Sequence, residues 1–279
     1  MLRVITDSTS DLTLENMKEM GIDIMPLTVR FGEEVYETIY EISNEEFFQK
    51  MASHDEKPCT SQVNPSQFEE AFSRYLNQGD DVICINIGSK LSGTFQSAVI
   101  AAREVNPKGD RISVIDTKSV SVVEIMAVEK AIAMASQGKS LVEVTEAVKE
   151  MLKRARFFIM LENLDFLRHG GRISKEEYVA GENLGIKPII KVDDTLSVVD
   201  KVKGKKGMSR FFMQVLEENE LEEDSTIYIC HGNAPEMADS FQNMLVENGI
   251  NNKVKIFCLG PIIGAHLGAN CLGVGFLLK

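Results

Sequence analysis

The alternation of short apolar runs with helical segments in the first half of the chain is the feature that most constrains its fold. Apolar runs at residues 2–6, 82–87 and 112–115 are each followed by a segment with helical spacing or a helix-capping pattern. Strands that alternate with helices in this way are typical of a parallel sheet covered by helices. The sequence therefore predicts an α/β architecture that begins with a parallel sheet.

Capping patterns fix where several of these helices begin. Ser43 and Glu46 have the spacing of a capping box, which predicts a helix through residue 51. Asn64 followed by Pro65 predicts a second start, because proline is favoured in the first helical turn. Further helices are expected at residues 14–20, 94–104, 121–137 and 141–154, and one more strand at residues 22–29.

The second half has a different pattern, which predicts a separate domain with a mixed sheet. Strands are expected at residues 157–160, 226–231 and 254–259, and a hairpin at residues 187–203 turns at 193–195. Helices are expected at residues 205–219 and 236–247. We therefore predict an N-terminal parallel α/β domain at residues 1–156 and a C-terminal mixed α/β domain at 157–279. A cleft between two such domains is the default place for a ligand.

Charge and composition exclude several classes of function. The formal net charge of -12 over 279 residues disfavours nonspecific binding to nucleic acid or to anionic lipid surfaces, which requires positive charge. The five scattered cysteines contain no CxxC pair, so neither a disulfide framework nor a zinc site is predicted. The sequence has no 18-residue apolar stretch and no secretory signal pattern. We expect a cytoplasmic protein without stable membrane insertion.

The apolar segment at residues 259–279 contains five glycines, with His266 as the one titratable side chain before Lys279. Glycines allow backbone to approach a ligand closely, and an imidazole beside an apolar wall can bond to an acid. This composition suits a ligand with a polar head and an apolar body. A glycine-faced helix that packs closely on a sheet, with His266 as a core residue, explains the same pattern.

Short polar motifs precede two of the predicted helices. Thr60-Ser61-Gln62 lies before the helix start at Asn64, and residues 88–94 (GSKLSGT) connect a strand to a helix. A hydroxyl at a helix start, such as that of Ser92, can cap the helix or receive an anion. The phosphate-loop and nucleophile-elbow patterns are absent from the sequence. A hydrolase with Ser92 as nucleophile and His266 as base stays open.

A basic loop, Arg168-His169-Gly170-Gly171-Arg172, follows a short helix predicted at residues 163–167. Basic residues near a helix end are favourable as a C-terminal cap. Alternatively, Arg172 could meet a phosphate or an acidic partner.

These motifs together resemble the DegV family, and the match covers essentially the whole chain. The matching residues are DSTSD at 7–11, TSQ at 60–62, SGT at 92–94 with Gln96, GGRI at 170–173, IKPII at 186–190, HGNA at 231–234 and GAHLG at 264–268. Seven motifs in the order found in the family make the resemblance specific.

The resemblance implies a two-domain protein that binds one long-chain fatty acid between its domains and needs no other cofactor. The carboxylate is then expected at Thr60, Ser92 and His266. The neighbouring residues Ser61, Gly93 and Thr94 form the supporting loops.

The resemblance also implies a partner. Some members of the family present the carboxylate to a separate ATP-binding fatty acid kinase subunit, which forms acyl-phosphate, and Arg172 is then expected to contact the partner or its phosphate. A stand-alone lipid carrier is the alternative. The chain departs from the family after Asp116, where Val123 and Ile125 stand near positions usually held by glycine. We expect these two side chains to narrow the tunnel if their helix lines it.

Overall fold

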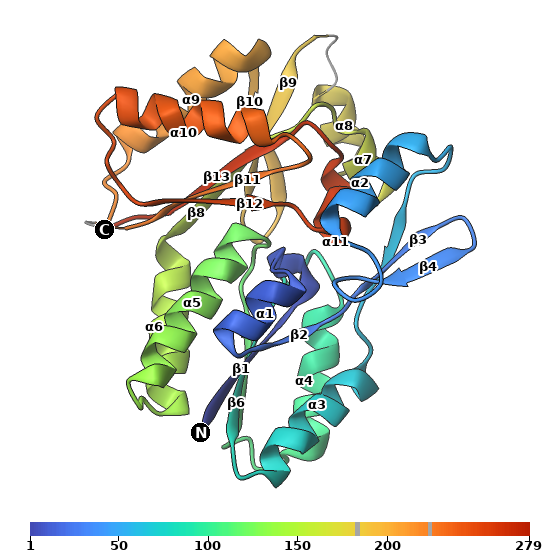
Figure 1. The fold of residues 1–279 in the computed structure, drawn as a ribbon, viewed down its shortest axis with the longest axis vertical. Helices are drawn as coiled ribbons and strands as arrows, with labels where there is room; N and C mark the ends of the chain where they lie inside the picture. Colours follow the sequence, from blue (N-terminus) through green and yellow to red (C-terminus); the bar gives the residue numbers. More distant parts are fainter. Residues whose placement is uncertain (182–184, 223–224) are drawn as a thin grey trace.

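Two β-sheets organise the chain in the computed structural model, which describes residues 1–181, 185–222 and 225–279 (Figure 1). The first sheet has the order β2-β1-β6-β7, and every pairing in it is parallel. Its strands are β1 (Leu2–Asp7), β2 (Asp23–Met25), β6 (Asp81–Asn86) and β7 (Ile112–Asp116). The predicted N-terminal parallel α/β arrangement is therefore confirmed.

Helices cover both faces of the first sheet (Figure 1). The pair α3 (Pro65–Asn77) and α4 (Thr94–Val105) lies on one face, and α5 (Val122–Ser136) and α6 (Leu141–Arg154) lie on the other. The predicted helix starts are confirmed, because α3 and α2 (Asn44–Ser53) both begin with complete capping boxes. A short helix, α1 (Leu14–Met20), packs near β2.

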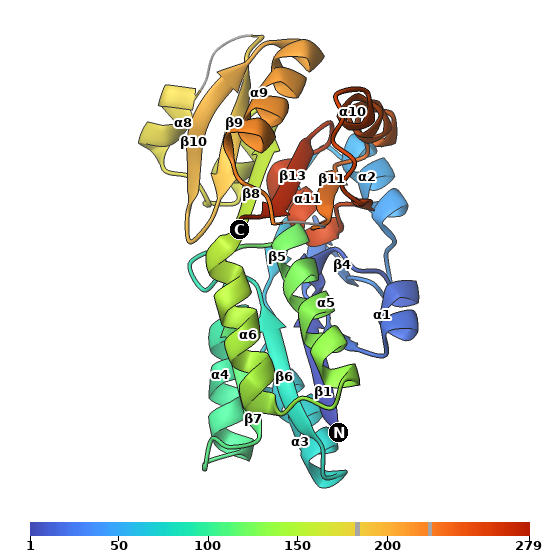
Figure 2. The ribbon, with the colours of Figure 1, turned by 90° about the vertical axis from the view of Figure 1, so that its left-hand side faces the viewer.

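The second sheet is mixed, as predicted, with the order β10-β9-β8-β13-β11-β12. Only β11 and β12 pair in parallel among its described strands. Its strands are β8 (Ala155–Met160), β9 (Lys187–Val192), β10 (Leu196–Val202), β11 (Ile227–His231), β12 (Val254–Cys258) and β13 (Leu272–Leu277). Helices α9 (Gly204–Glu218) and α10 (Pro235–Glu247) cover its outer face, while α5 contacts β8 and β11 from the other side (Figure 2).

The C-terminal segment forms one helix and one strand rather than a single glycine-faced helix. Helix α11 (Pro261–Leu267) carries His266, and β13 then lies between β8 and β11. A Cβ at Gly273 would come within 2.7 Å of the Cys230 sulfur, and one at Gly275 within 2.6 Å of a Val122 methyl group. These two glycines therefore allow neighbouring elements to pack against the sheet.

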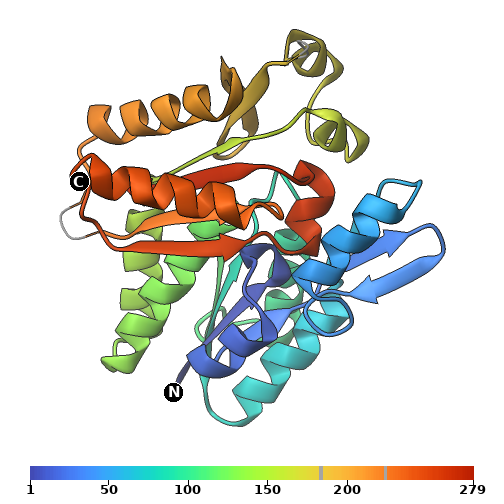
Figure 3. The ribbon, with the colours of Figure 1, turned by 45° about the horizontal axis from the view of Figure 1, so that its top comes forward.

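The single strand predicted at residues 22–29 is wrong, because the chain leaves the first sheet at Pro26. Its second part, β3 (Thr28–Phe31), joins a three-stranded antiparallel sheet with β4 (Glu34–Glu37) and β5 (Cys59–Ser61). Figure 3 shows this small sheet projecting beside α2, close to α11. The sheet was not predicted, and β5 carries Thr60 on it.

One large hydrophobic cluster spans both halves of the chain. It contains Phe47 and Phe48 from α2 together with Ile262 and Ile263 from α11. A second cluster lies between the six-stranded sheet and its two outer helices. The division into domains at residue 156 stays a prediction, because the core is continuous across it.

Candidate functional site

A cavity of about 310 Å³ lies where α11, β5 and the start of α4 meet. Its wall is largely apolar, and its polar residues come from the motifs singled out in the sequence. The apolar lining is Leu27, Ile87, Leu91, Val120, Leu167, Val192, Leu196, Ile262, Ile263 and Leu267. The remaining lining is Thr60, Ser61, Gln62, Ser92, Gly93, Arg172 and His266. Thus Thr60, Ser92 and His266 are brought to one cavity, together with Arg172.

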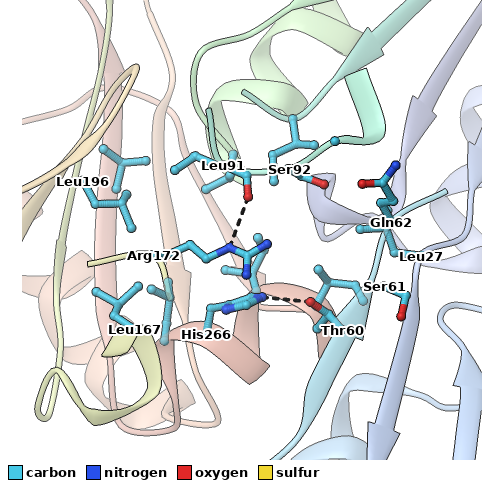
Figure 4. A pocket seen from close by; sticks show the side chains of 17 residues that line it. Leu27, Thr60, Ser61, Gln62, Leu91, Ser92, Leu167, Arg172, Leu196 and His266 are labelled. Atoms are coloured by element: carbon cyan, nitrogen blue, oxygen red, sulfur yellow. Dashed lines mark hydrogen bonds between the residues drawn. The ribbon is translucent and has the colours of Figure 1, made fainter. Parts of the chain in front are cut away.

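Thr60 and His266 both line the cavity and contact each other directly. Thr60 Oγ1 lies 2.9 Å from His266 Nε2, and Figure 4 shows the two side chains facing each other. Thr60 comes from β5 and His266 from α11, so elements far apart in the sequence must meet to form this pair. Gly264, two residues before His266, allows α11 to pack closely on α2, because a Cβ there would lie 2.7 Å from the Phe47 ring.

His266 is held as a neutral imidazole. Burial, with the positive charge of Arg172 and the nearby His169, lowers the pKa of His266 to about 4. Its Nδ1 has no hydrogen-bond partner among the described residues, and a Cβ on Gly170 would lie 2.2 Å from that atom. The ring is therefore confined on its Nδ1 side by the backbone of Gly170 and bonded to Thr60 on its Nε2 side.

The Ser92 hydroxyl is oriented by the start of α4. Ser92 Oγ accepts a hydrogen bond from the Thr94 backbone N–H at 3.2 Å and lies 3.0 Å from Thr94 Oγ1. Thr94 is buried and supports Ser92 without lining the cavity. Gly93 is needed for space, because a Cβ there would overlap the side-chain oxygen of Gln62 at 2.0 Å. Gln62 was not among the predicted site residues, although it belongs to the same motif as Thr60.

Arg172 lies on the cavity lining, whereas the sequence suggested a contact with a partner. Its Nε donates to the Leu91 carbonyl at 3.2 Å, and its Nη1 donates to the Gly170 carbonyl. Figure 4 shows the guanidinium group reaching between Leu91 and the Thr60–His266 pair. Arg172 also lines a second, polar cavity of about 540 Å³ that shares Leu91, Ser92, Gly93 and Leu196 with the first. The guanidinium can therefore contact a ligand group in the first cavity or in the second.

Val123 and Ile125 were expected to narrow the tunnel if their helix lines it, and this condition is not met at the described lining of this cavity. Both side chains are buried in the first turn of α5, and neither belongs to the described lining of the cavity. Val123 instead lines a separate cavity near the end of β9. Asp116 has a local role, because its side chain accepts hydrogen bonds from the Ser89 and Lys118 backbone N–H groups.

The DSTSD motif lies beneath the site and supports it. Asp11 accepts a hydrogen bond at 2.7 Å from the backbone N–H of Gly260, the residue that caps α11. Burial raises the pKa of Asp11 to about 7. The motif therefore positions the helix that carries His266.

A neutral glutamic acid lies next to this motif. The Thr9 hydroxyl lies 2.5 Å from Asp7 Oδ1 and 2.7 Å from Glu124 Oε2, and all three side chains are buried. One hydroxyl proton cannot serve two carboxylates, so one of the two acids carries a proton. Asp7 also accepts bonds from the Thr9, Ile87 and Asn86 N–H groups, which stabilise its charge. Burial raises the pKa of both acids, and that of Glu124 well above its usual value. Because Asp7 accepts the three N–H bonds, we assign the proton to Glu124.

The described contacts do not form a hydrolytic triad. His266 bonds to the hydroxyl of Thr60 rather than to that of Ser92, and no carboxylate of the described residues orients its Nδ1. A metal site is also not indicated, since the described residues contain no cluster of three metal-binding side chains. Within the described part of the chain, no helix is long and apolar enough to span a membrane.

Comparison with known proteins gives matches along the entire chain. A family model described as an uncharacterised protein of the DegV family matches residues 1–279. A DegV domain-containing protein from Clostridium acetobutylicum is 32% identical over 279 residues, covering 100% of this chain and 99% of the relative.

Two solved structures have the same fold. One is described as showing fatty acid binding of a DegV family protein from Thermus thermophilus, with 26% identity and a TM-score of 0.90. The other is a stearic acid-binding protein from Eubacterium ventriosum, with 26% identity and a TM-score of 0.89. Each alignment covers 100% of this chain and 99% of the solved one.

Proposed function

The chain belongs to the DegV family, and from this premise we propose that it binds one long-chain fatty acid. The carboxylate is bound by Thr60, Ser92 and His266, and the acyl chain occupies the apolar cavity. The observation that carries the proposal is the Thr60–His266 pair, which lies on a cavity that is otherwise mainly apolar. The solved relatives described as binding fatty acids support it, because their folds match over the whole chain.

The energetics of such a ligand fit the composition of the cavity. Each buried methylene contributes about 0.8 kcal/mol, so the acyl chain supplies most of the affinity. The carboxylate opposes binding, because desolvating a charge without partners costs several kcal/mol. Two hydroxyl groups and an imidazole offer hydrogen bonds to it, and the guanidinium of Arg172 offers a positive charge nearby.

We further propose that the protein presents the bound carboxylate to an ATP-binding fatty acid kinase subunit. The polar second cavity supports this, because it adjoins the first at Ser92 and Arg172 and also carries Lys90. Lys90 is paired with Asp194 in this cavity, so Arg172 is the cation that a phosphate donor entering there would meet beside the carboxylate. A stand-alone carrier would bind the same ligand without such a partner, so the two proposals differ in one measurable step.

Fatty acid binding is tested by extraction of the purified protein and by titration with labelled acids. We expect near-stoichiometric fatty acid in the extract by mass spectrometry. Thr60→Val and Ser92→Ala should each weaken binding, since a hydrogen bond to a charged group contributes about 1.5–3 kcal/mol. Ser136→Ala, at the end of α5 and outside the cavity lining, is the matched control. Protein that is empty on purification and also fails to bind added acids would refute the proposal.

The kinase step is tested by mixing the loaded protein with ATP and an ATP-binding fatty acid kinase subunit. We expect acyl-phosphate, detected by trapping with hydroxylamine. Arg172→Gln should lower the rate of its formation by a larger factor than it lowers fatty acid affinity, because the guanidinium faces both cavities. Esterase activity of the isolated protein that disappears in Ser92→Ala would favour the hydrolase instead.

A further inference from the structure

A third cavity, of about 660 Å³, lies where the end of α6 and the start of β8 meet the β9–β10 hairpin (Figure 2). Five of its lining residues are basic and three are acidic, although the whole chain carries 42 acidic and 30 basic residues. The basic residues come from four separate segments of the chain, and they are Lys118, Lys149, Lys153, Arg156 and Lys191. Positive charge is therefore concentrated here on an acidic protein, which favours an anionic ligand.

Each of the three acidic residues in the lining has a partner of its own. Asp193 pairs with Lys191 at 2.8 Å, and Asp194 pairs with Lys90, which is not part of the described lining. The Asp116 carboxylate accepts hydrogen bonds from two backbone N–H groups. These contacts offset the negative charge that would otherwise repel an anion in the cavity.

Two of the basic residues, Arg156 and Lys118, form no ion pair among the described residues. Arg156 Nη1 donates to the backbone carbonyls of Lys153 and Ala155, at 3.0 and 2.8 Å, and its Nε and Nη2 have no acceptor in the described part of the chain. A guanidinium with free N–H groups can bind a phosphate through two parallel hydrogen bonds. The Lys118 side chain is exposed and carries the second uncompensated charge.

Lys149 and Lys153 can add to this positive charge. They pair with Glu146 and Glu150 along α6, and all four side chains are more than half exposed. Ion pairs between exposed side chains contribute little to stability. Either lysine can therefore turn toward a ligand at low cost.

The size and the apolar part of the cavity indicate an organic anion rather than a simple ion. At about 660 Å³ the cavity lies within the roughly 300–1,000 Å³ usual for sites that enclose a small organic molecule. Val123 and Leu152 also line it and offer apolar contact. We propose that the third cavity is a second ligand site, which binds a phosphorylated compound of nucleotide size. Arg156 and Lys118 bind the phosphate, and the two apolar side chains contact the organic part.

Titration with ADP as the probe tests the site in the purified protein. We expect saturable binding by calorimetry at low salt, and at least about tenfold weaker binding of adenosine, which lacks the phosphates. Arg156→Gln and Lys118→Gln should each lower ADP affinity at least about tenfold, because each removes a charged hydrogen-bond donor. Arg103→Gln is the matched control, since Arg103 is an exposed cation of α4 outside the described lining. Circular dichroism checks the fold, and the exposed Lys118 decides the test if loss of the Arg156 bonds unfolds the other variant.

Chemical protection locates the ligand without substitution. Saturating ADP should protect Lys118 and Lys191 from acetylation in peptide mass spectrometry, whereas Lys130, an exposed residue of α5 outside the described lining, should stay reactive. Protection of Lys90 instead would place ADP in the second cavity and overturn the inference. Absence of saturable ADP binding, or unchanged ADP affinity in the folded Lys118→Gln protein, would also overturn it. Failure to bind fatty acid would bear on the proposed function alone, because the described linings of the first and third cavities share one residue, Val192.

Discussion

Replacement of His266 by glutamine should remove a defined part of the pH dependence of stability. The ring has a pKa of about 4 in the folded protein and about 6.5 in an unfolded chain. The unfolded chain therefore binds the proton more readily than the folded protein. The contribution of His266 to the unfolding free energy is fully present above pH 6.5 and is lost as the pH falls toward 4. Between pH 7 and pH 5 this linkage costs the wild-type protein about 2 kcal/mol of unfolding free energy.

The assay is urea denaturation of delipidated protein, followed by circular dichroism at pH 7 and pH 5. His266→Gln keeps a polar side chain that can bond to Thr60 but has no proton to gain in this range. Asp11, whose pKa burial raises to about 7, contributes in the opposite sense, but it is common to both proteins and cancels in the comparison. A variant that loses as much stability as the wild type between the two pH values would refute the neutral, buried state of His266.

Three further predictions follow from close packing and buried protons. Gly170→Ala should lower fatty acid affinity at least about tenfold in titrations while circular dichroism stays unchanged, because its Cβ would lie 2.2 Å from Nδ1 of His266 and displace the ring. Glu124→Gln should cost less than about 1 kcal/mol of unfolding free energy, because an amide replaces a neutral acid, whereas Glu124→Ala should cost about 2–3 kcal/mol in the same urea titration. Gly275→Ala should lower the unfolding free energy by about 1–3 kcal/mol, because its Cβ would overlap Val122.

The parts of the fold that could be predicted are those with local causes. The capping residues Ser43 and Asn64 fixed two helix starts, because the cap acts within one turn. The strand through residue 25 was found from its apolar run, but its end at Pro26 was not. The chain there crosses to another sheet, and that choice depends on partners far away in the sequence, such as β5.

The candidate site was predictable to a similar extent. The resemblance to the DegV family implied Thr60, Ser92 and His266 as one set, and the structure brings all three to one cavity. The position of Arg172 was not predictable, because it depends on how its loop folds back onto Leu91. Local sequence also could not show that the first turn of α5, with Val123, faces a different cavity.

The position of β13 has a consequence for how the second half of the chain folds. Without this strand, β8, β9 and β10 form one unit, and β11 and β12 form another, each with an open edge. Because β13 follows all of them in the sequence, the sheet closes only when the last of its strands arrives. Shortened chains that end before β13 should therefore expose two unpaired strand edges and associate with one another. The helix that carries His266 directly precedes this strand, so the binding site and the closing of the sheet would be completed in the same late step of folding.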